Sequence, residues 1–179
     1  MKSIMTPQHN FAETPGTRVP RASFNRSHGI KTTFDAGKLI PILVDEVLPG
    51  DSFNLKDHGF GRLATPINPV MDNMFLDTFY FFVPNRLLWD NFQKFMGEQT
   101  NPGDSIDYLI PQMDAPAGGF AEGSVGDFFG IPTATAGISV NALPKRAYDL
   151  IWNEWFRDEN LQDSITISKG DGPDTPLGS

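Results

Sequence analysis

The side chains that could catalyse a reaction are acidic residues that occur in pairs. The pairs are Asp45–Glu46, Asp72–Asp77 and Asp158–Glu159. Glycoside hydrolysis needs two carboxyl groups that face each other across a cleft, roughly 5 to 9.5 Å apart. No pattern around these pairs predicts a cleft. Asp77 lies inside an apolar run, so we interpret it as a buried carboxylate that pairs with Arg62 or Arg86, or as a turn cap.

Other catalytic and metal-binding signatures are missing from the sequence. The three histidines are scattered, and the chain has no cysteine for a thiolate nucleophile or a zinc site. No serine lies in a G-x-S-x-G elbow. The glycines of residues 117–124 are not followed by Lys-Ser or Lys-Thr, so they do not form a phosphate-binding loop. We therefore predict no enzyme activity, no cofactor and no metal site.

The composition predicts a folded protein with many turns and loops. Of the 179 residues, 39% are hydrophobic, while Gly (17) and Pro (15) are frequent. Phe is abundant at 15, which places much of the burial energy in large apolar rings. The N-terminus lacks the apolar core of a signal peptide, and no apolar run reaches the length of a membrane span. We expect a soluble, unexported protein without membrane insertion.

Charge is distributed unevenly along the chain. Residues 1–38 carry six basic and two acidic groups, a net charge of +4, so the remainder carries −12. We interpret residues 1–31 as an extended basic arm, because proline and glycine interrupt every helical or strand period there. The candidate DNA-binding residues of this arm are Arg18, Arg21, Arg26 and Lys31. Basic groups neutralise phosphates and the interleaved phenylalanines could stack on bases, but an arm that lies on a neighbouring subunit explains the same pattern.

Residues 32–179 alternate between strand patterns and short helices. Apolar runs predict strands at 39–48, from residue 52, and at 74–83, with a turn at Leu48–Asp51. Short helices are predicted at 85–96, 124–129 and 144–157, separated by a long connector at 97–123. Residues 169–179 are turn-formers and predict the base of a surface loop. Three or four strands cannot close a sandwich, so this pattern predicts part of a larger domain.

Two helices are more apolar than one buried face requires. Most of their aromatic side chains are expected to cover the core of the sandwich. Because aromatic residues are enriched where subunits meet, we also expect some of them to contact another chain. The candidate interface residues are Trp89, Phe92, Trp152 and Trp155.

Four blocks of the sequence resemble the major capsid protein of gokushoviruses, in the family Microviridae. These blocks are Leu43–Asp51, Met71–Arg86, Trp89–Glu98 and Tyr148–Gln162, and they occur in the expected order. The resemblance implies a mainly β fold, the viral jelly roll, which is an eight-stranded antiparallel sandwich with long inter-strand loops and short helices. Residues 32–179 would form its N-terminal part, with the rest of the domain outside this chain.

The resemblance also implies a structural role in a T=1 icosahedral virion that encloses circular single-stranded DNA. The expected partners are further copies of the chain, the packaged DNA, scaffolding or minor capsid proteins, and a host surface receptor. Assembly would take place in the bacterial host cytoplasm. A lectin-like, carbohydrate-binding sandwich is the alternative. It needs exposed aromatic platforms on loops, and the 97–123 connector offers Tyr108 and Phe120.

Overall fold

The structure is a computed structural model that describes residues 20–175. The chain divides into two compact units, Met1–Lys31 and Thr32–Ser179. In the described part of the first unit, residues 20–31 are exposed and contain neither helix nor strand. All regular structure of the described residues therefore lies in the second unit.

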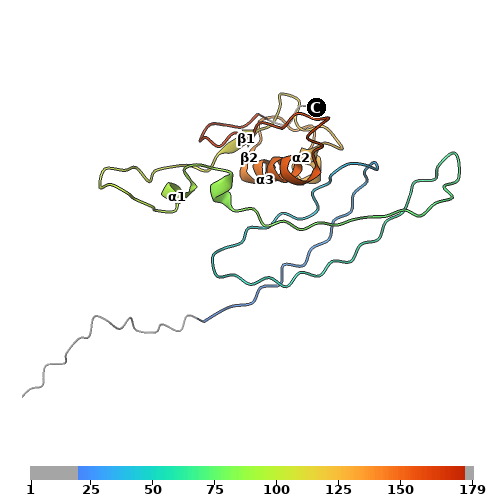
Figure 1. Cartoon of the computed structure of the whole chain (residues 1–179), viewed down its shortest axis with the longest axis horizontal. Coiled ribbons are helices and arrows are strands. Elements are labelled where there is room, and N and C mark those ends of the chain that lie inside the picture. The colour runs from blue at the N-terminus through green and yellow to red at the C-terminus, as the bar shows by residue number, and fades with distance from the viewer. Residues whose placement is uncertain (1–19, 176–179) are drawn as a thin grey trace, which may run out of the picture. The chain divides into compact units, whose positions relative to one another are not determined.

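The second unit contains short elements joined by long irregular segments (Figure 1). In chain order these elements are the 3-10 helix η1 (Asn85–Leu87), α1 (Phe92–Phe95), β1 (Gln112–Asp114), α2 (Val125–Phe128), β2 (Ser139–Asn141), α3 (Leu143–Ile151) and the π-helix η2 (Trp152–Phe156). β1 and β2 form an antiparallel pair in which Met113 lies opposite Val140. Within residues 20–175, no helix is long and apolar enough to cross a membrane.

Helices α3 and η2 form one continuous helical run, close to the predicted 144–157. Pro144 lies in the first turn of α3, where its missing N–H costs no hydrogen bond. The helical turn predicted at 124–129 is α2, and the Ser124 side chain accepts a hydrogen bond from the Asp127 N–H. The predicted turn at Leu48–Asp51 is also present, because the Asp51 N–H bonds the Leu48 carbonyl and Gly50 has a φ of 86°. The predicted 85–96 helix is split into η1 and α1.

The core consists of two small clusters. In the first, the buried Leu88, Trp89 and Leu143 pack with half-buried side chains that include Phe92 and Phe95. In the second, Met113, Phe120 and Ala142 join the β1–β2 pair to α2. Phe120 packs so closely on Gly126 that a Cβ there would lie 2.4 Å from its ring. The core thus fixes α3 against the η1–α1 region on one side and the small sheet on the other.

The strands predicted at 39–48, from residue 52, and at 74–83 are not formed. Among residues 20–175, the only strands are β1, inside the predicted 97–123 connector, and β2. An apolar, β-branched or aromatic sequence becomes a strand only when a neighbour completes its backbone hydrogen bonds. The extended segments are joined instead by side chains, for example by the Tyr80 hydroxyl, which donates to Asp57 at 2.8 Å. The described fold is mostly non-helical with one small antiparallel sheet, and that part of the fold prediction is confirmed.

Candidate assembly site

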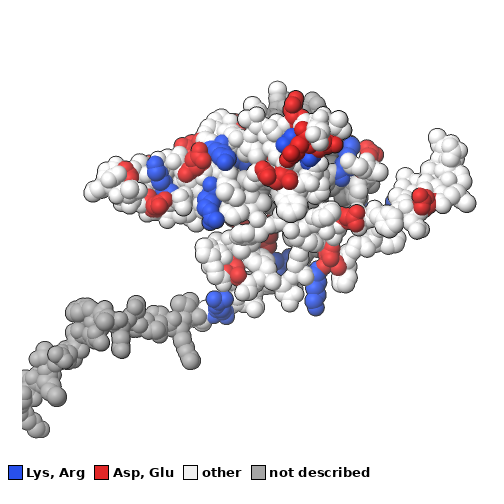
Figure 2. Space-filling view, viewed as in Figure 1, with Lys and Arg blue, Asp and Glu red and all other residues white. Residues whose placement is uncertain are grey.

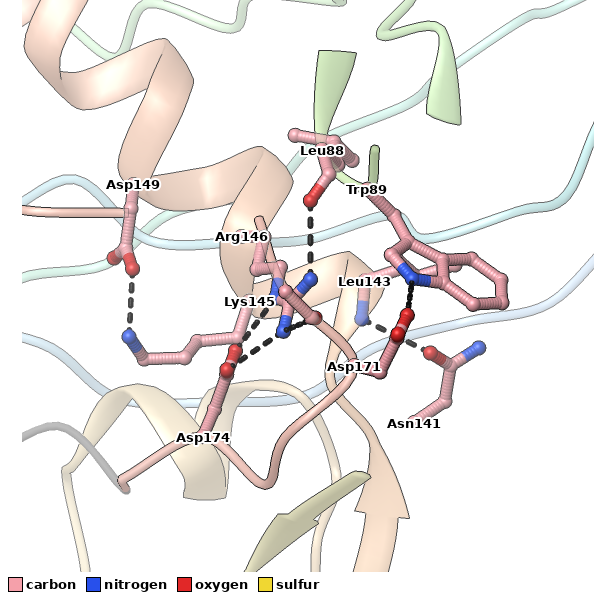
Figure 3. A network of polar contacts seen from close by, with 10 residues as sticks. Leu88, Trp89, Asn141, Leu143, Lys145, Arg146, Asp149, Asp171 and Asp174 are labelled. Carbon is pink, nitrogen blue, oxygen red and sulfur yellow. Dashed lines mark hydrogen bonds and ion pairs between the residues drawn. The ribbon is translucent and has the colours of Figure 1, made fainter. Parts of the chain in front are cut away.

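A network of buried charged side chains connects α3 to residues 169–175 (Figure 3). The Arg146 side chain is 1% exposed, and it binds Asp174 through two hydrogen bonds of 2.8 Å from its Nε and Nη2 atoms. Its remaining donors reach the carbonyl oxygens of Leu88 at 3.1 Å and Gly170 at 3.0 Å. One guanidinium group therefore joins three segments that are distant in sequence.

A second acidic residue of the same segment contacts the core tryptophan. The indole N–H of Trp89 donates to Asp171 at 2.5 Å, and the Asn91 amide donates to both carboxylate oxygens of Asp171. Backbone hydrogen bonds from Asp90 to Lys169 and from Asp174 to Gln112 complete the attachment. We call Arg146, Asp171, Asp174 and Trp89 the polar network. Residues 169–175 are therefore attached to the core at several points. All of them except Asp174 are exposed and they contain neither helix nor strand, which agrees with their prediction as the base of a surface loop.

A neighbouring ion pair on α3 is also buried. Lys145 Nζ lies 2.6 Å from Asp149, whose side chain is 1% exposed. The other carboxylate oxygen of Asp149 has no hydrogen-bond partner among residues 20–175. Burial raises the pKa of Asp149 from its ordinary value, and the hydrogen bond from Lys145 opposes that rise. Asp149 also lines a cavity of about 160 Å³ together with Thr166, Ser168 and Thr175.

We expect Asp171 to contribute to stability in a pH-dependent manner. The hydrogen bond from Trp89, followed by those from Asn91, lowers the pKa of Asp171 below its ordinary value of 3.8. This contribution is therefore complete above the unfolded-state pKa and is lost as pH falls through the lower folded-state pKa. At pH 6 the urea midpoint of the wild-type protein should be higher than that of Asp171→Asn. The difference between the two midpoints should shrink as the pH falls below about 4. A difference that is constant from pH 6 to pH 2.5 would contradict the assignment.

Aromatic side chains gather where η2 meets the extended segment 74–83. The ring centroids of Phe81 and Trp155 are 5.6 Å apart, and Phe156 packs edge to face against Phe79 at 5.5 Å. We call Phe79, Phe81, Trp155 and Phe156 the aromatic face. Trp155 is nevertheless 72% exposed and Phe79 57% exposed. Rings that are packed against one another but still open to solvent lie on the surface of this chain rather than in its core.

The predicted interface residues lie in different environments. Trp89 is fully buried within the chain, so its side chain offers no surface to another subunit. Phe92 is half-buried beside it. Trp152 is also half-buried and lines a cavity of about 240 Å³ with Tyr148. Trp155 is the exposed member of the set. A contact with another subunit is therefore expected mainly at this residue.

The predicted DNA-binding residues are not part of the polar network or the aromatic face. Arg21, Arg26 and Lys31 are exposed residues of the first unit, and Arg18 lies outside the described residues. Among residues 20–175, no group of three or more His, Asp or Glu side chains is arranged to hold a metal ion. The contacts described above are those of apolar packing and ion pairing.

Comparison with known proteins identifies the family. The family model for the phage capsid protein (F protein) matches residues 12–178, which is nearly the whole chain. The chain belongs to this capsid protein family. The resemblance to microvirus capsid proteins is thereby confirmed.

Three curated relatives of this capsid chain carry the name capsid protein VP1. The chain is 57% identical to that of Bdellovibrio phage phiMH2K over 167 residues, which is 93% of this chain and 31% of the relative. It is 49% identical to that of Chlamydia phage 1, with 96% of this chain and 29% of the relative covered. It is 34% identical to that of Spiroplasma virus 4, with 94% of this chain and 31% of the relative covered. The capsid chain thus spans about a third of the length of these relatives.

Sequence reasoning found neither the polar network of the capsid chain nor the neighbouring Lys145–Asp149 ion pair. The Lys145–Asp149 pair has an i,i+4 spacing that could have predicted it on a helix. Arg146 and Asp174 are 28 residues apart, and Trp89 and Asp171 are 82 residues apart. No local pattern connects residues at such separations, so only the tertiary structure shows these partnerships.

Proposed function

We propose that the protein containing this chain assembles with copies of itself into a T=1 icosahedral capsid, which encloses circular single-stranded DNA in the virion. The observation that carries this proposal is the family match over residues 12–178. Catalysis is not part of the proposed role. Minor capsid or scaffolding proteins and a host receptor are its further proposed partners, and the host cytoplasm is the proposed place of assembly.

The proposed fold of the whole protein is the eight-stranded jelly roll, with residues 1–31 as an arm and 32–179 as the N-terminal part of the sandwich. The state of the extended segments supports this proposal. Four large apolar side chains there are at least 85% exposed, namely Phe60, Ile67, Met71 and Phe75. Figure 2 shows uncharged surface along these segments between scattered charged side chains. An apolar surface of this extent requires cover from further strands or subunits.

Expression of the complete reading frame that encodes this chain tests the proposal. We expect closed, uniform particles in negative-stain electron microscopy and an early peak in size-exclusion chromatography, because apolar burial between subunits drives association. Nuclease-protected DNA inside the particles would support the role in genome enclosure. A soluble monomer that binds a glycan array would contradict the capsid proposal and favour the lectin-like alternative.

A further inference from the structure

We propose that the aromatic face, together with the acidic turn that follows it, binds the basic N-terminal arm of a second copy of the chain. The acidic turn is defined as residues 157–163. This inference deepens the proposed capsid function and rests on it. It assigns one surface and one partner to the contact between copies.

The aromatic face has the properties of a binding surface. Trp155 is 72% exposed and Leu161, on the acidic turn, is 82% exposed. Trp155 belongs to a π-helix, a rare conformation that often occurs at functional sites. Its ring is already held by Phe81, so little further ordering is needed when a partner binds. Covering these rings would remove large apolar areas from water.

The acidic turn is preformed and carries three carboxylates and one guanidinium group, a net charge of −2. The Gln162 N–H and the Asn160 N–H both bond Asp158, and Arg157 Nη1 donates to the Gln162 carbonyl at 2.9 Å. Around this framework lie Glu154, Glu159 and Asp163, all exposed and without a side-chain partner among residues 20–175. Carboxylates at this density repel nucleic acid and attract a basic peptide.

The N-terminal arm is complementary to this surface in both charge and apolar character. Arg21, Arg26 and Lys31 alternate with Phe24, which is 82% exposed, and Ile30, which is 52% exposed. A guanidinium group over the Trp155 ring would add a cation–π contact to the ion pairs. Arg21 and Arg26 are five residues apart in an extended segment, which allows a reach of about 17 Å between them. That distance suits a peptide laid across a surface rather than inserted into a pocket.

A disulfide cross-link tests this contact directly. The 179 residues of this chain contribute no cysteine, and any cysteine elsewhere in the reading frame is first replaced by serine. Ser27→Cys on the arm and Asn160→Cys on the acidic turn, both at exposed positions, are introduced into the complete reading frame. After mild oxidation we expect covalent dimers and a ladder of higher oligomers on a non-reducing gel. The matched control combines Ser27→Cys with Thr100→Cys, at an exposed position on a different loop, and should give no ladder.

Charge reversal then tests the proposed chemistry of the contact. Arg26→Glu or Glu159→Lys should each lower the yield of the cross-link about fivefold, and high salt should lower it for the wild-type charges. The two reversals combined should restore it. An unchanged yield would overturn the proposal, as would a cross-link found only within monomers. If the arm is released from the particle only by nuclease treatment, it lies on DNA, and this outcome would also overturn the proposal. Particles without the ladder would overturn this inference alone, whereas the absence of both would overturn the capsid proposal as well.

Discussion

Replacing Arg146 by leucine is expected to lower the free energy of unfolding by about 3 to 5 kcal/mol, because the substitution leaves a buried carboxylate without its counter-charge. The Asp174 side chain is 6% exposed and receives both of its short hydrogen bonds from Arg146. The carbonyl oxygens of Leu88 and Gly170 lose their donors in the same step. The loss should appear as a lower urea midpoint, with residues 169–175 exchanging amide hydrogens first.

Lys38→Met is the matched control for this measurement. Lys38 also forms a salt bridge, to Asp35 at 3.2 Å, but these side chains are 55% and 85% exposed. Exposed pairs of this kind contribute between zero and about 1 kcal/mol, so the urea midpoint should barely move. Equal decreases in the urea midpoint for Arg146→Leu and Lys38→Met would show that the buried Arg146–Asp174 pair stabilises the fold no more than the exposed Lys38–Asp35 pair.

A double variant separates the two causes of the expected loss. In Arg146→Met/Asp174→Leu the buried charges are removed together, so no isolated carboxylate remains. Replacement of a buried ion pair by apolar side chains of similar volume is often neutral or even stabilising. We therefore expect the double variant to recover much of the stability that Arg146→Leu loses. A double variant that is no more stable than the single one would instead assign the effect to the carbonyl contacts, which both variants lose.

The sequence predicted those elements whose causes are local. The helical run that contains α3 and η2 follows from apolar spacing and from Pro144 near its start. The Ser124 cap and the turn at Gly50 likewise depend on residues only a few positions apart. Each of these elements is defined by hydrogen bonds between residues close in sequence, so its pattern can be recognised locally even though packing contributes to its stability.

Elements that depend on distant partners could not be predicted in the same way. Residues 74–83 carry the strongest strand pattern, yet they form no strand because none of residues 20–175 supplies a hydrogen-bonding neighbour. The polar network could not be predicted for a related reason. Asp171 contacts Trp89 and Asp174 contacts Arg146, and no rule of sequence spacing pairs residues so far apart. Aromatic content identified Trp89 and Trp155 together, but it could not separate the buried ring from the exposed one.

These two tryptophans should therefore respond differently to the same substitution. Trp89 is 0% exposed, and the centroid of its ring lies 5.3 Å from that of Phe95 and 6.3 Å from that of Phe92. Trp89→Ala should lower the free energy of unfolding by about 3 to 5 kcal/mol, because it leaves a large cavity in a small core. It also removes the N–H that Asp171 accepts. Trp89→Phe keeps most of the apolar volume and should lose less in the urea midpoint.

Trp155→Ala is the matched control on the exposed ring. Because Trp155 is 72% exposed, its truncation removes little buried area and should change the urea midpoint by much less than Trp89→Ala. In the same complete protein it should, however, weaken the contact between copies and lower the yield of the Ser27–Asn160 cross-link. If Trp155→Ala unfolded the chain as readily as Trp89→Ala, the aromatic face would belong to the core and not to the surface. Opposite outcomes in the two assays would separate folding of the chain from its assembly.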